Sequence, residues 1–326
     1  MQDVTDLAFM KVMDHFGGPD VYVTEYFRVH ADSRLEPRIL RSVTENATGR
    51  PVFAQLIGQD IPALVRSARE LEEYPVAGID LNLGCPAPVV CRKDAGGGLL
   101  RNPEKVARIL SALREAVSGR FTVKTRVGYE SADEFEALLE VFSGCPIDAL
   151  TIHGRTVRER YQTPVHPDCV RRAVELMPCP VIANGNVVNV PTGQAYLERT
   201  GAAGLMIGRG AIRNPLLFAQ LRAAWAGGDT PPLRRCDLLE YIEMLYHETA
   251  AAHPRHDPDK QVQKMKKYLV YMVQGLEDAF EYRVRRVRSE AEFFGVCREY
   301  LANATPAPDW PEERSKLFCG FAELVR

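Results

Sequence analysis

The sequence predicts an α/β fold, a (β/α)8 TIM barrel, with an all-helical domain after it, and three observations lead to this prediction. Short β-branched runs alternate with amphipathic helical patterns from residue 21 to residue 210, the order of elements in a parallel sheet with helical crossovers. The runs are apolar almost throughout, as in strands that are covered on both faces. Nearly every run ends in a polar residue or a glycine, and polar groups at the carboxyl ends of successive strands form the active site of such a barrel.

Seven runs are expected as strands: VYVTEY (21–26), PVFAQLIG (51–58), AGIDLNLG (77–84), FTVKTRVG (121–128), DALTIHGR (148–155), PVIANG (180–185) and AGLMIGRG (203–210). The amphipathic stretches 103–117, 131–142 and 167–176 are expected as helices between them. A closed barrel of this class needs eight strands. Because DVTDLAFMKVM (3–13) already has the pattern of a loop and a helix that follow a strand, we expect the eighth strand to precede residue 1.

The alternation stops after Gly210, and the Gly/Pro-rich stretch GGDTPPLRR (227–235) has the composition of a linker. From Asp237 onward the hydrophobic pattern is helical only. We therefore expect a catalytic barrel domain over residues 1–230 and a helical domain over residues 236–326. Basic residues outnumber acidic ones in the connecting stretches of the second domain, at Lys260, Lys264, Lys266, Lys267, Arg283, Arg285, Arg286 and Arg288.

The composition is that of an ordinary globular protein: 326 residues, 46% hydrophobic and 26% charged, with a net charge of −2. No run of 18 apolar residues predicts a membrane span, and the N-terminal residues lack the pattern of a signal peptide. The eight cysteines show no C-x-x-C and no zinc-ligand spacing. We expect a cytoplasmic protein with reduced thiols, no bound metal and no membrane partner.

Two sets of residues point to a phosphorylated, electron-rich ligand. ANGN (183–186) and GRG (208–210) follow the last two strands, where barrels of this class commonly bind phosphate. Lys124 and Arg126 are two apart on one strand, so they point into the same barrel mouth, and His153 follows on the next strand. These cations could stabilise a reduced, anionic ring. The alternatives are glycines that only serve the turns and cations that only form salt bridges on the barrel rim.

Cys85 is the sharpest candidate for chemistry. It lies in a G-C-P turn at the carboxyl end of a strand, where the proline restricts its backbone to extended geometry. A thiol of ordinary pKa, near 8.5, is mostly protonated at neutral pH and can act as a general acid. A buried structural cysteine, the expectation for the other seven, is the alternative.

NLGCP, Gln55, VKTRVG, IHGRT, VIANG and MIGRG, in this order over nearly the whole chain, resemble the tRNA dihydrouridine synthases. The resemblance implies an FMN-binding barrel with a helical tRNA-binding domain, which reduces the C5=C6 bond of uridine with NADPH or NADH as the reductant. VTEYFRV, VFAQLIGQ and KMKKYLVYM are most similar to the bacterial subgroup that acts on position 16 of the D-loop.

The resemblance also implies roles for individual residues. Cys85 would protonate C5 after hydride reaches C6. The residues implied to bind the cofactor are Met1, Gln2, Asp3, Gln55, Lys124, His153, Asn184, Gly185, Asn186, Gly208 and Arg209. Those implied to contact tRNA are Arg28, Asn82, Tyr161, Lys264, Lys266 and Arg286.

Two other functions are compatible with the sequence. One is another FMN barrel that acts on a small molecule, such as a dihydroorotate dehydrogenase or an ene-reductase, although the basic helical region argues against it. The other is a non-catalytic, truncated tRNA-binding relative. In each case we expect a monomer.

Overall fold

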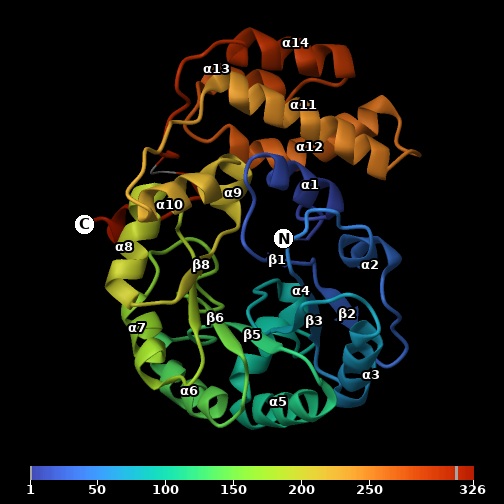
Figure 1. Cartoon of the computed structure of the whole chain (residues 1–326), viewed down its shortest axis with the longest axis vertical. Helices are drawn as coiled ribbons and strands as arrows, with labels where there is room; N and C mark the ends of the chain where they lie inside the picture. Colours follow the sequence, from blue (N-terminus) through green and yellow to red (C-terminus); the bar gives the residue numbers. More distant parts are fainter. Residues whose placement is uncertain (1, 313–314) are drawn as a thin grey trace.

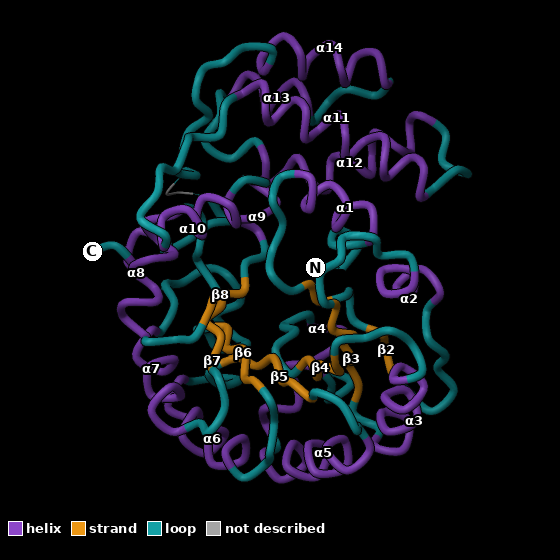
Figure 2. The backbone as a smooth tube through the Cα atoms, viewed as in Figure 1, coloured by secondary structure: helices purple, strands orange, loops and turns teal. Residues whose placement is uncertain are grey.

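The computed structural model describes residues 2–312 and 315–326. Its centre is a parallel sheet whose strands follow one another in chain order, and Figure 2 shows this sheet curling inside a ring of helices. The TIM-barrel class predicted from the sequence is confirmed. The strands are β1 (Tyr22–Val23), β2 (Phe27–Val29), β3 (Val52–Gly58), β4 (Gly78–Asn82), β5 (Phe121–Arg126), β6 (Ala149–His153), β7 (Val181–Asn184) and β8 (Gly204–Met206).

The first predicted strand, 21–26, is two short strands in the structure. Both β1 and β2 pair with β3 in parallel, and residues 24–26 lie between them. The interruption has a local cause, because the side-chain hydroxyl of Thr24 accepts the backbone N–H of Gln55 at 3.0 Å. A side-chain oxygen thus replaces a backbone carbonyl in the ladder, and the backbone turns toward the carboxyl end of the sheet.

Within the described residues, β8 pairs with β7 alone, and β1 pairs with β3 alone, so the sheet stays open between β8 and β1. The loop and helix expected at the start of the chain are present: α1 (Leu7–His15) begins after Asp6, whose side chain accepts the N–H of Phe9. A strand before residue 1 lies outside the described residues and stays a prediction.

The outer helices bury one apolar face each against the sheet. Leu64, Leu110, Leu138 and Val170 are fully buried examples in one continuous core with the strands. The outer helices are α2 (Pro37–Thr44), α3 (Ile61–Glu72), α5 (Pro103–Ala116), α6 (Phe135–Ser143), α7 (Pro167–Leu176), α8 (Val190–Thr200) and α10 (Leu217–Trp225). The short helices α4 (Pro88–Cys91) and α9 (Arg209–Arg213), with 3-10 turns at Gly96–Arg101 and Ala132–Glu134, lie in the loops.

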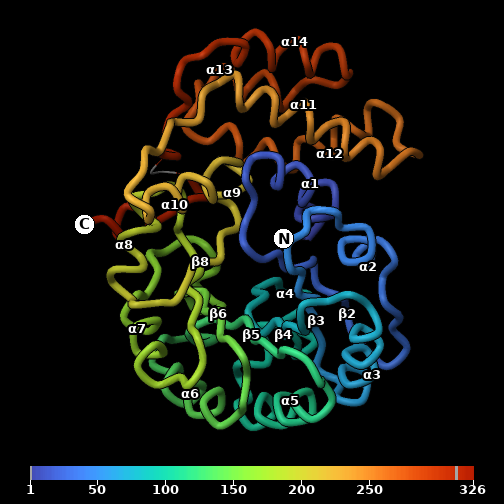
Figure 3. Tube along the Cα trace, viewed as in Figure 1, coloured from blue at the N-terminus to red at the C-terminus, as the bar shows by residue number. Residues whose placement is uncertain are grey.

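The helices of the C-terminal part lie together above the sheet (Figure 1): α11 (Arg235–Ala252), α12 (Pro258–Met272), α13 (Asp278–Val284) and α14 (Glu290–Leu301). They share a second apolar core with α1 and α9, in which Phe9 stacks on Tyr268 and Phe16 packs edge-on against Tyr241. Figure 3 shows the N-terminal segment beside α12, although the two are far apart in the sequence. No helix in the described part of the chain is long and apolar enough to cross a membrane.

Residues 302–312 and 315–326 return to the sheet without a helix longer than the 3-10 turn at Ala322–Leu324, whereas the sequence predicted helix only. The prolines of PAPDWP (306–311) explain this difference, since proline cannot donate to a helix ladder. The buried guanidinium of Arg213 holds the returning chain by donating to the carbonyl oxygens of Pro308 and Asp309, at 2.5 and 2.9 Å. Phe318 and Phe321 then pack around Val188.

Two glycines should respond oppositely to substitution by alanine. A Cβ on Gly210 would overlap the carbonyl oxygen of Val187, whereas one on Gly295 would meet no atom within 4 Å. We expect Gly210→Ala to lower the free energy of unfolding by about 1–3 kcal/mol. Gly295→Ala, on the exposed face of α14, should raise it by about 0.5–1 kcal/mol. Urea unfolding measures both, and equal effects of the two variants would contradict the tight packing of Gly210.

Candidate active site

The turn that holds Cys85 is built at the carboxyl end of β4. The side-chain oxygen of Asn82 accepts the backbone N–H groups of Gly84 and Cys85, both at 3.0 Å, and the Cys85 carbonyl accepts the N–H of Gly97 at 3.0 Å. The thiol itself remains half-buried. Hydrogen bonds therefore fix the backbone on both sides of Cys85 and leave its side chain accessible from the mouth.

Asn82 is in turn held by a chain of polar groups that includes Gln55 and two residues the sequence analysis did not single out, Asp80 and Thr122. Its amide donates to Gln55 at 2.8 Å, Gln55 donates to Asp80 at 2.7 Å, and Thr122 donates to the other Asp80 oxygen at 2.6 Å. Burial raises the pKa of Asp80, and these hydrogen bonds oppose that rise. Asn82, implied to contact RNA, thus lies buried and also supports the Cys85 turn.

The buried cations expected at the mouth are present. Lys124 donates to the side-chain oxygen of Asn184 at 3.0 Å, and Asn184 donates to the carbonyl of Met206 at 2.8 Å. Burial, together with the nearby Arg126, lowers the pKa of Lys124 to about 8. Burial and the neighbouring cations also hold the pKa of His153 well below its ordinary value, so its imidazole is neutral at pH 7.

Three buried polar atoms at the ends of β6 and β7 have no hydrogen-bond partner among the described residues: Nδ1 of His153, Nη1 of Arg155 and Nδ2 of Asn186. Beside them, Gly185 has φ +117°, and a side chain there would press on His153 and Val165. Buried polar groups in proteins are normally paired. This region therefore offers unused donors and a backbone that a ligand can approach closely.

Three arginines give the mouth its positive charge, and two of them lie against Tyr161. The guanidinium groups of Arg209 and Arg126 lie 4.5 and 5.3 Å from the Tyr161 ring centre. Arg155 donates to Asn186 at 2.8 Å and to the carbonyl of Cys319 at 2.9 Å. Burial lowers the pKa of each of the three arginines. In residues 2–312 and 315–326 no carboxylate lies within ion-pair distance of these guanidinium groups, so the cluster suits an anionic ligand.

Sequence reasoning also did not single out Tyr26. It follows the Thr24 interruption, and its phenol is electrostatically coupled to the Cys85 thiol. The guanidinium of Arg28 lies 5.5 Å from its ring centre. Burial, followed by the neighbouring Cys85, raises the pKa of Tyr26 to about 12, so the phenol remains protonated at neutral pH. The sequence predicts Tyr26 at the end of an uninterrupted strand, and nothing local links it to Cys85.

The remaining predicted residues fall into three groups. Met1 lies outside the described residues, while Gln2 and Asp3 form a turn before α1. The side chains of Arg28 and Arg286 are exposed, and that of Lys266 is half-buried. Lys264 is buried, which differs from the exposed position expected of an RNA contact. No cluster of three or more His, Cys, Asp or Glu side chains suited to a metal ion occurs in the described ranges.

The chain is similar to known proteins in sequence and in fold. The family model described as dihydrouridine synthase (Dus) matches residues 1–304. The tRNA-dihydrouridine(16) synthase of Ralstonia nicotianae is 32% identical over 317 residues, 93% of this chain and 94% of that protein. Its counterpart in Cupriavidus necator is 31% identical over 323 residues, with 95% and 98% covered. Among solved structures, the 6-hydroxypseudooxynicotine amine oxidase of Pseudomonas geniculata N1 aligns with a TM-score of 0.50 over 73% of this chain and 47% of its own, at 13% identity, which is a likeness of fold alone.

Removal of the Tyr26 hydroxyl should slow the reaction of Cys85 with iodoacetamide. The phenol is coupled to the Cys85 sulfur, and a hydrogen bond that it donates during the reaction would stabilise the thiolate that attacks the reagent. We expect Tyr26→Phe to lower the alkylation rate of Cys85 about fivefold at pH 7.5, the effect of one hydrogen bond. Site-resolved mass spectrometry measures this rate separately from the other cysteines.

Tyr22→Phe is the matched control, because the Tyr22 hydroxyl donates to the carbonyl of Met10 at 3.0 Å, away from Cys85. That variant should alkylate Cys85 at the unmodified rate. Equal rates for the Tyr26 variant and the unmodified protein would show that the phenol does not influence the thiol.

Proposed function

The chain belongs to the dihydrouridine synthase family, and we propose on this basis that it reduces the C5=C6 bond of a uridine in tRNA to 5,6-dihydrouridine. The observation that carries the proposal is the Cys85 turn, in which an accessible thiol is fixed at the carboxyl end of β4 by hydrogen bonds from both sides. The relatives named tRNA-dihydrouridine(16) synthase support a target at position 16.

The residues at the ends of β6, β7 and β8 fit an FMN cofactor. The unpartnered donors of His153, Arg155 and Asn186 can serve its polar groups, and Arg209 adds a buried positive charge for the phosphate. Gly185 and Gly208 would let the backbone approach the ligand, while Lys124, Asn184 and Gln55, with the segment Met1–Asp3, would hold the ring side. When bound and reduced by NADPH or NADH, FMN supplies the hydride for C6 of the uracil.

Cys85 then acts as the general acid. Its thiol transfers its proton to C5, the carbon next to the one that receives hydride, and the resulting thiolate regains a proton from solvent. The neutral phenol of Tyr26 is coupled to the sulfur, and it can donate a hydrogen bond that stabilises the thiolate as it forms. The buried cations around Lys124 and Arg126 favour negative charge in the mouth.

A surface on the C-terminal helices is suited to RNA. The guanidinium of Arg286 lies 3.6 Å from the ring centre of Tyr282, whose side chain is 60% exposed. An exposed aromatic ring beside a cation suits both base stacking and phosphate contact. We propose that Arg286, Lys266, Arg28 and Tyr161 contact tRNA, and that the target uridine leaves its stack to reach Cys85. Residues 1–230 would form the catalytic domain and 236–326 the RNA-binding domain of a cytoplasmic monomer.

Replacement of Cys85 by alanine tests the acid. Cys85→Ala should bind FMN and accept electrons from NADPH at the normal rate, because Cys85 is not among the residues expected to bind the cofactor. Formation of dihydrouridine in tRNA should fall by about 100-fold or more, the usual contribution of a general acid. Dihydrouridine is quantified by mass spectrometry of digested tRNA, and electron uptake by flavin absorbance.

Cys236→Ala is the control for removal of a thiol. Cys236 is also half-buried, but it lies on α11 and not in the Cys85 turn. That variant should therefore keep full activity. A Cys85→Ala variant with normal dihydrouridine formation would overturn the assignment of the proton donor.

Replacement of Lys266 and Arg286 by alanine tests the RNA surface. The double variant should bind tRNA more weakly, and the slope of log affinity against log salt should fall by about 1 for each phosphate that the protein no longer binds. NADPH oxidation without tRNA should not change, since Lys266 lies on α12 and Arg286 in the turn after α13, both in the C-terminal part of the chain. An unchanged affinity and salt slope, measured by filter binding over a salt series, would exclude these two residues from the RNA interface.

A further inference from the structure

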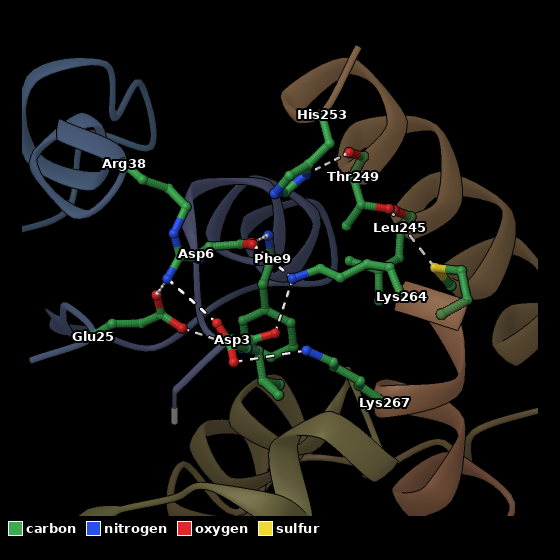
Figure 4. Close-up of polar contacts among 12 residues, drawn as sticks. Asp3, Asp6, Phe9, Glu25, Arg38, Leu245, Thr249, His253, Lys264 and Lys267 are labelled. Carbon is green, nitrogen blue, oxygen red and sulfur yellow. Dashed lines mark hydrogen bonds and ion pairs between the residues drawn. The ribbon is translucent and has the colours of Figure 1, made fainter. Parts of the chain in front are cut away.

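The side chain of Lys264 on α12 is buried against the N-terminal segment (Figure 4). Its ammonium lies 3.1 Å from the Asp6 carboxylate, and the two side chains are only 8% and 7% exposed. It also donates to the carbonyl oxygen of Asp3 at 2.8 Å and lies 5.4 Å from the ring centre of Tyr268. To reach a phosphate on the surface, Lys264 would have to leave Asp6 as an unpaired buried carboxylate, which is unfavourable.

The residues that Lys264 holds form a turn with a demanding backbone. Asp3 has φ +58°, a left-handed conformation that costs energy for a residue with a side chain. Asp6 accepts the N–H of Phe9 at 3.2 Å and so caps α1. Lys264 thus fixes both ends of residues 3–6, through a carbonyl at one end and the capping carboxylate at the other.

The same turn is joined to the carboxyl end of β1. Glu25 follows β1, its side chain is 2% exposed, and it accepts the N–H of Val4 at 3.2 Å. Arg38 lies 2.6 Å from Glu25 and 3.6 Å from Asp3, and Lys267 lies 3.6 Å from Asp3 on the other side. Figure 4 shows these groups converging from α2, the β1 loop and α12 onto one segment. Glu25 lies between Thr24, which accepts the N–H of Gln55, and Tyr26, so the turn is joined to the segment that carries Tyr26 to the mouth.

We propose that Lys264 is a positioning residue of the catalytic mouth: α12 uses it to hold residues 3–6 in the conformation that completes the cofactor-side rim at β1. The inference rests on the proposed function for the identity of the cofactor, FMN. It separates Lys264 from its neighbour Lys266, which donates to the carbonyl of Val287 at 2.8 Å and is less buried. One helix then serves both RNA binding and the cofactor site. Lys264 and Lys266 are two residues apart, so they lie on nearly opposite sides of α12.

Lys264→Met, with Lys266→Met as the matched control on the same helix, tests this proposal. The dissociation constant and the visible absorption and circular dichroism spectra of bound FMN are measured without tRNA, and tRNA affinity is measured over a salt series. Lys264→Met should weaken FMN binding about tenfold or more, the effect of removing a charge-assisted hydrogen bond, and should alter the flavin spectra. Its salt slope for tRNA should equal that of the unmodified protein. Lys266→Met should leave FMN affinity and the flavin spectra unchanged and should lower the salt slope for tRNA.

Asp6→Asn makes the same test from the other side of the ion pair. Asparagine is also a good helix N-cap, so α1 keeps its cap while the charge that pairs with Lys264 is removed. Weaker FMN binding and altered flavin spectra in Asp6→Asn, with an unchanged tRNA salt slope, support the proposal.

Lys264→Arg keeps the positive charge, so it should bind FMN more tightly than Lys264→Met. Normal FMN affinity and spectra in both Lys264→Met and Asp6→Asn, with a reduced salt slope in the former, would overturn it and make Lys264 an RNA contact.

Hydrogen exchange of the peptide 2–9 keeps this proposal separate from the proposed function. Faster exchange of that peptide in Lys264→Met, measured without FMN or tRNA, supports the positioning role whatever the cofactor is. An unmodified protein that binds no FMN would end the proposed function, while this exchange measurement would still decide on Lys264. Unchanged exchange would overturn the positioning role even if the enzyme forms dihydrouridine.

Discussion

Asp80 lies buried inside the sheet, and its carboxylate accepts hydrogen bonds from Thr122 and Gln55. Gln55 accepts from Asn82, whose side-chain oxygen holds the backbone of Cys85. Each member of this chain fixes the orientation of the next, because an amide that donates on one side must accept on the other. The Asp80 carboxylate in the sheet interior thus fixes the position of Cys85 at the mouth, through Gln55 and Asn82. Buried polar networks are favourable only when their members are satisfied, and the members of this one pair with one another.

Electrostatics gives the same mouth a second constraint. Lys124, Arg126, Arg155 and Arg209 are buried near one another, and burial lowers the pKa of each. Their partners are carbonyls, amides and aromatic rings in the described parts of the chain. Among the described residues these four cations form no ion pair with a carboxylate, although Asp80 acts on Lys124 and Glu159 acts on Arg155 over a longer distance. Buried positive charge that is not paired destabilises the free protein and favours an anionic ligand. His153 differs, since its lowered pKa leaves a neutral ring that can accept as well as donate.

The C-terminal helices belong to this arrangement physically and are not a separate attachment. They share an apolar core with α1 and α9, and the buried pair of Lys264 and Asp6 crosses the same boundary. The returning chain after Leu301 adds a third connection, through Arg213 and through the carbonyl that Cys319 offers to Arg155. A change in the helices can therefore reach the rim of the mouth through direct contacts.

The sequence by itself determined the parallel strands of the barrel, the bounds of the helices α5, α6 and α7 to within about four residues, and the Cys85 turn. It could do so because hydrophobic period, proline and glycine act on neighbouring residues. It also predicted that Lys124 and His153 meet in one mouth, since parallel strands end at one edge. Only the tertiary structure decided the roles of Asp80 and Tyr26, the burial of Lys264 and the return of residues 302–312 and 315–326. Each of these depends on groups far apart along the chain, such as Lys264 and Asp6. The local sequence cannot show whether a lysine in a basic stretch faces solvent or a buried carboxylate, because the exposure of its side chain depends on the distant residues that pack against it.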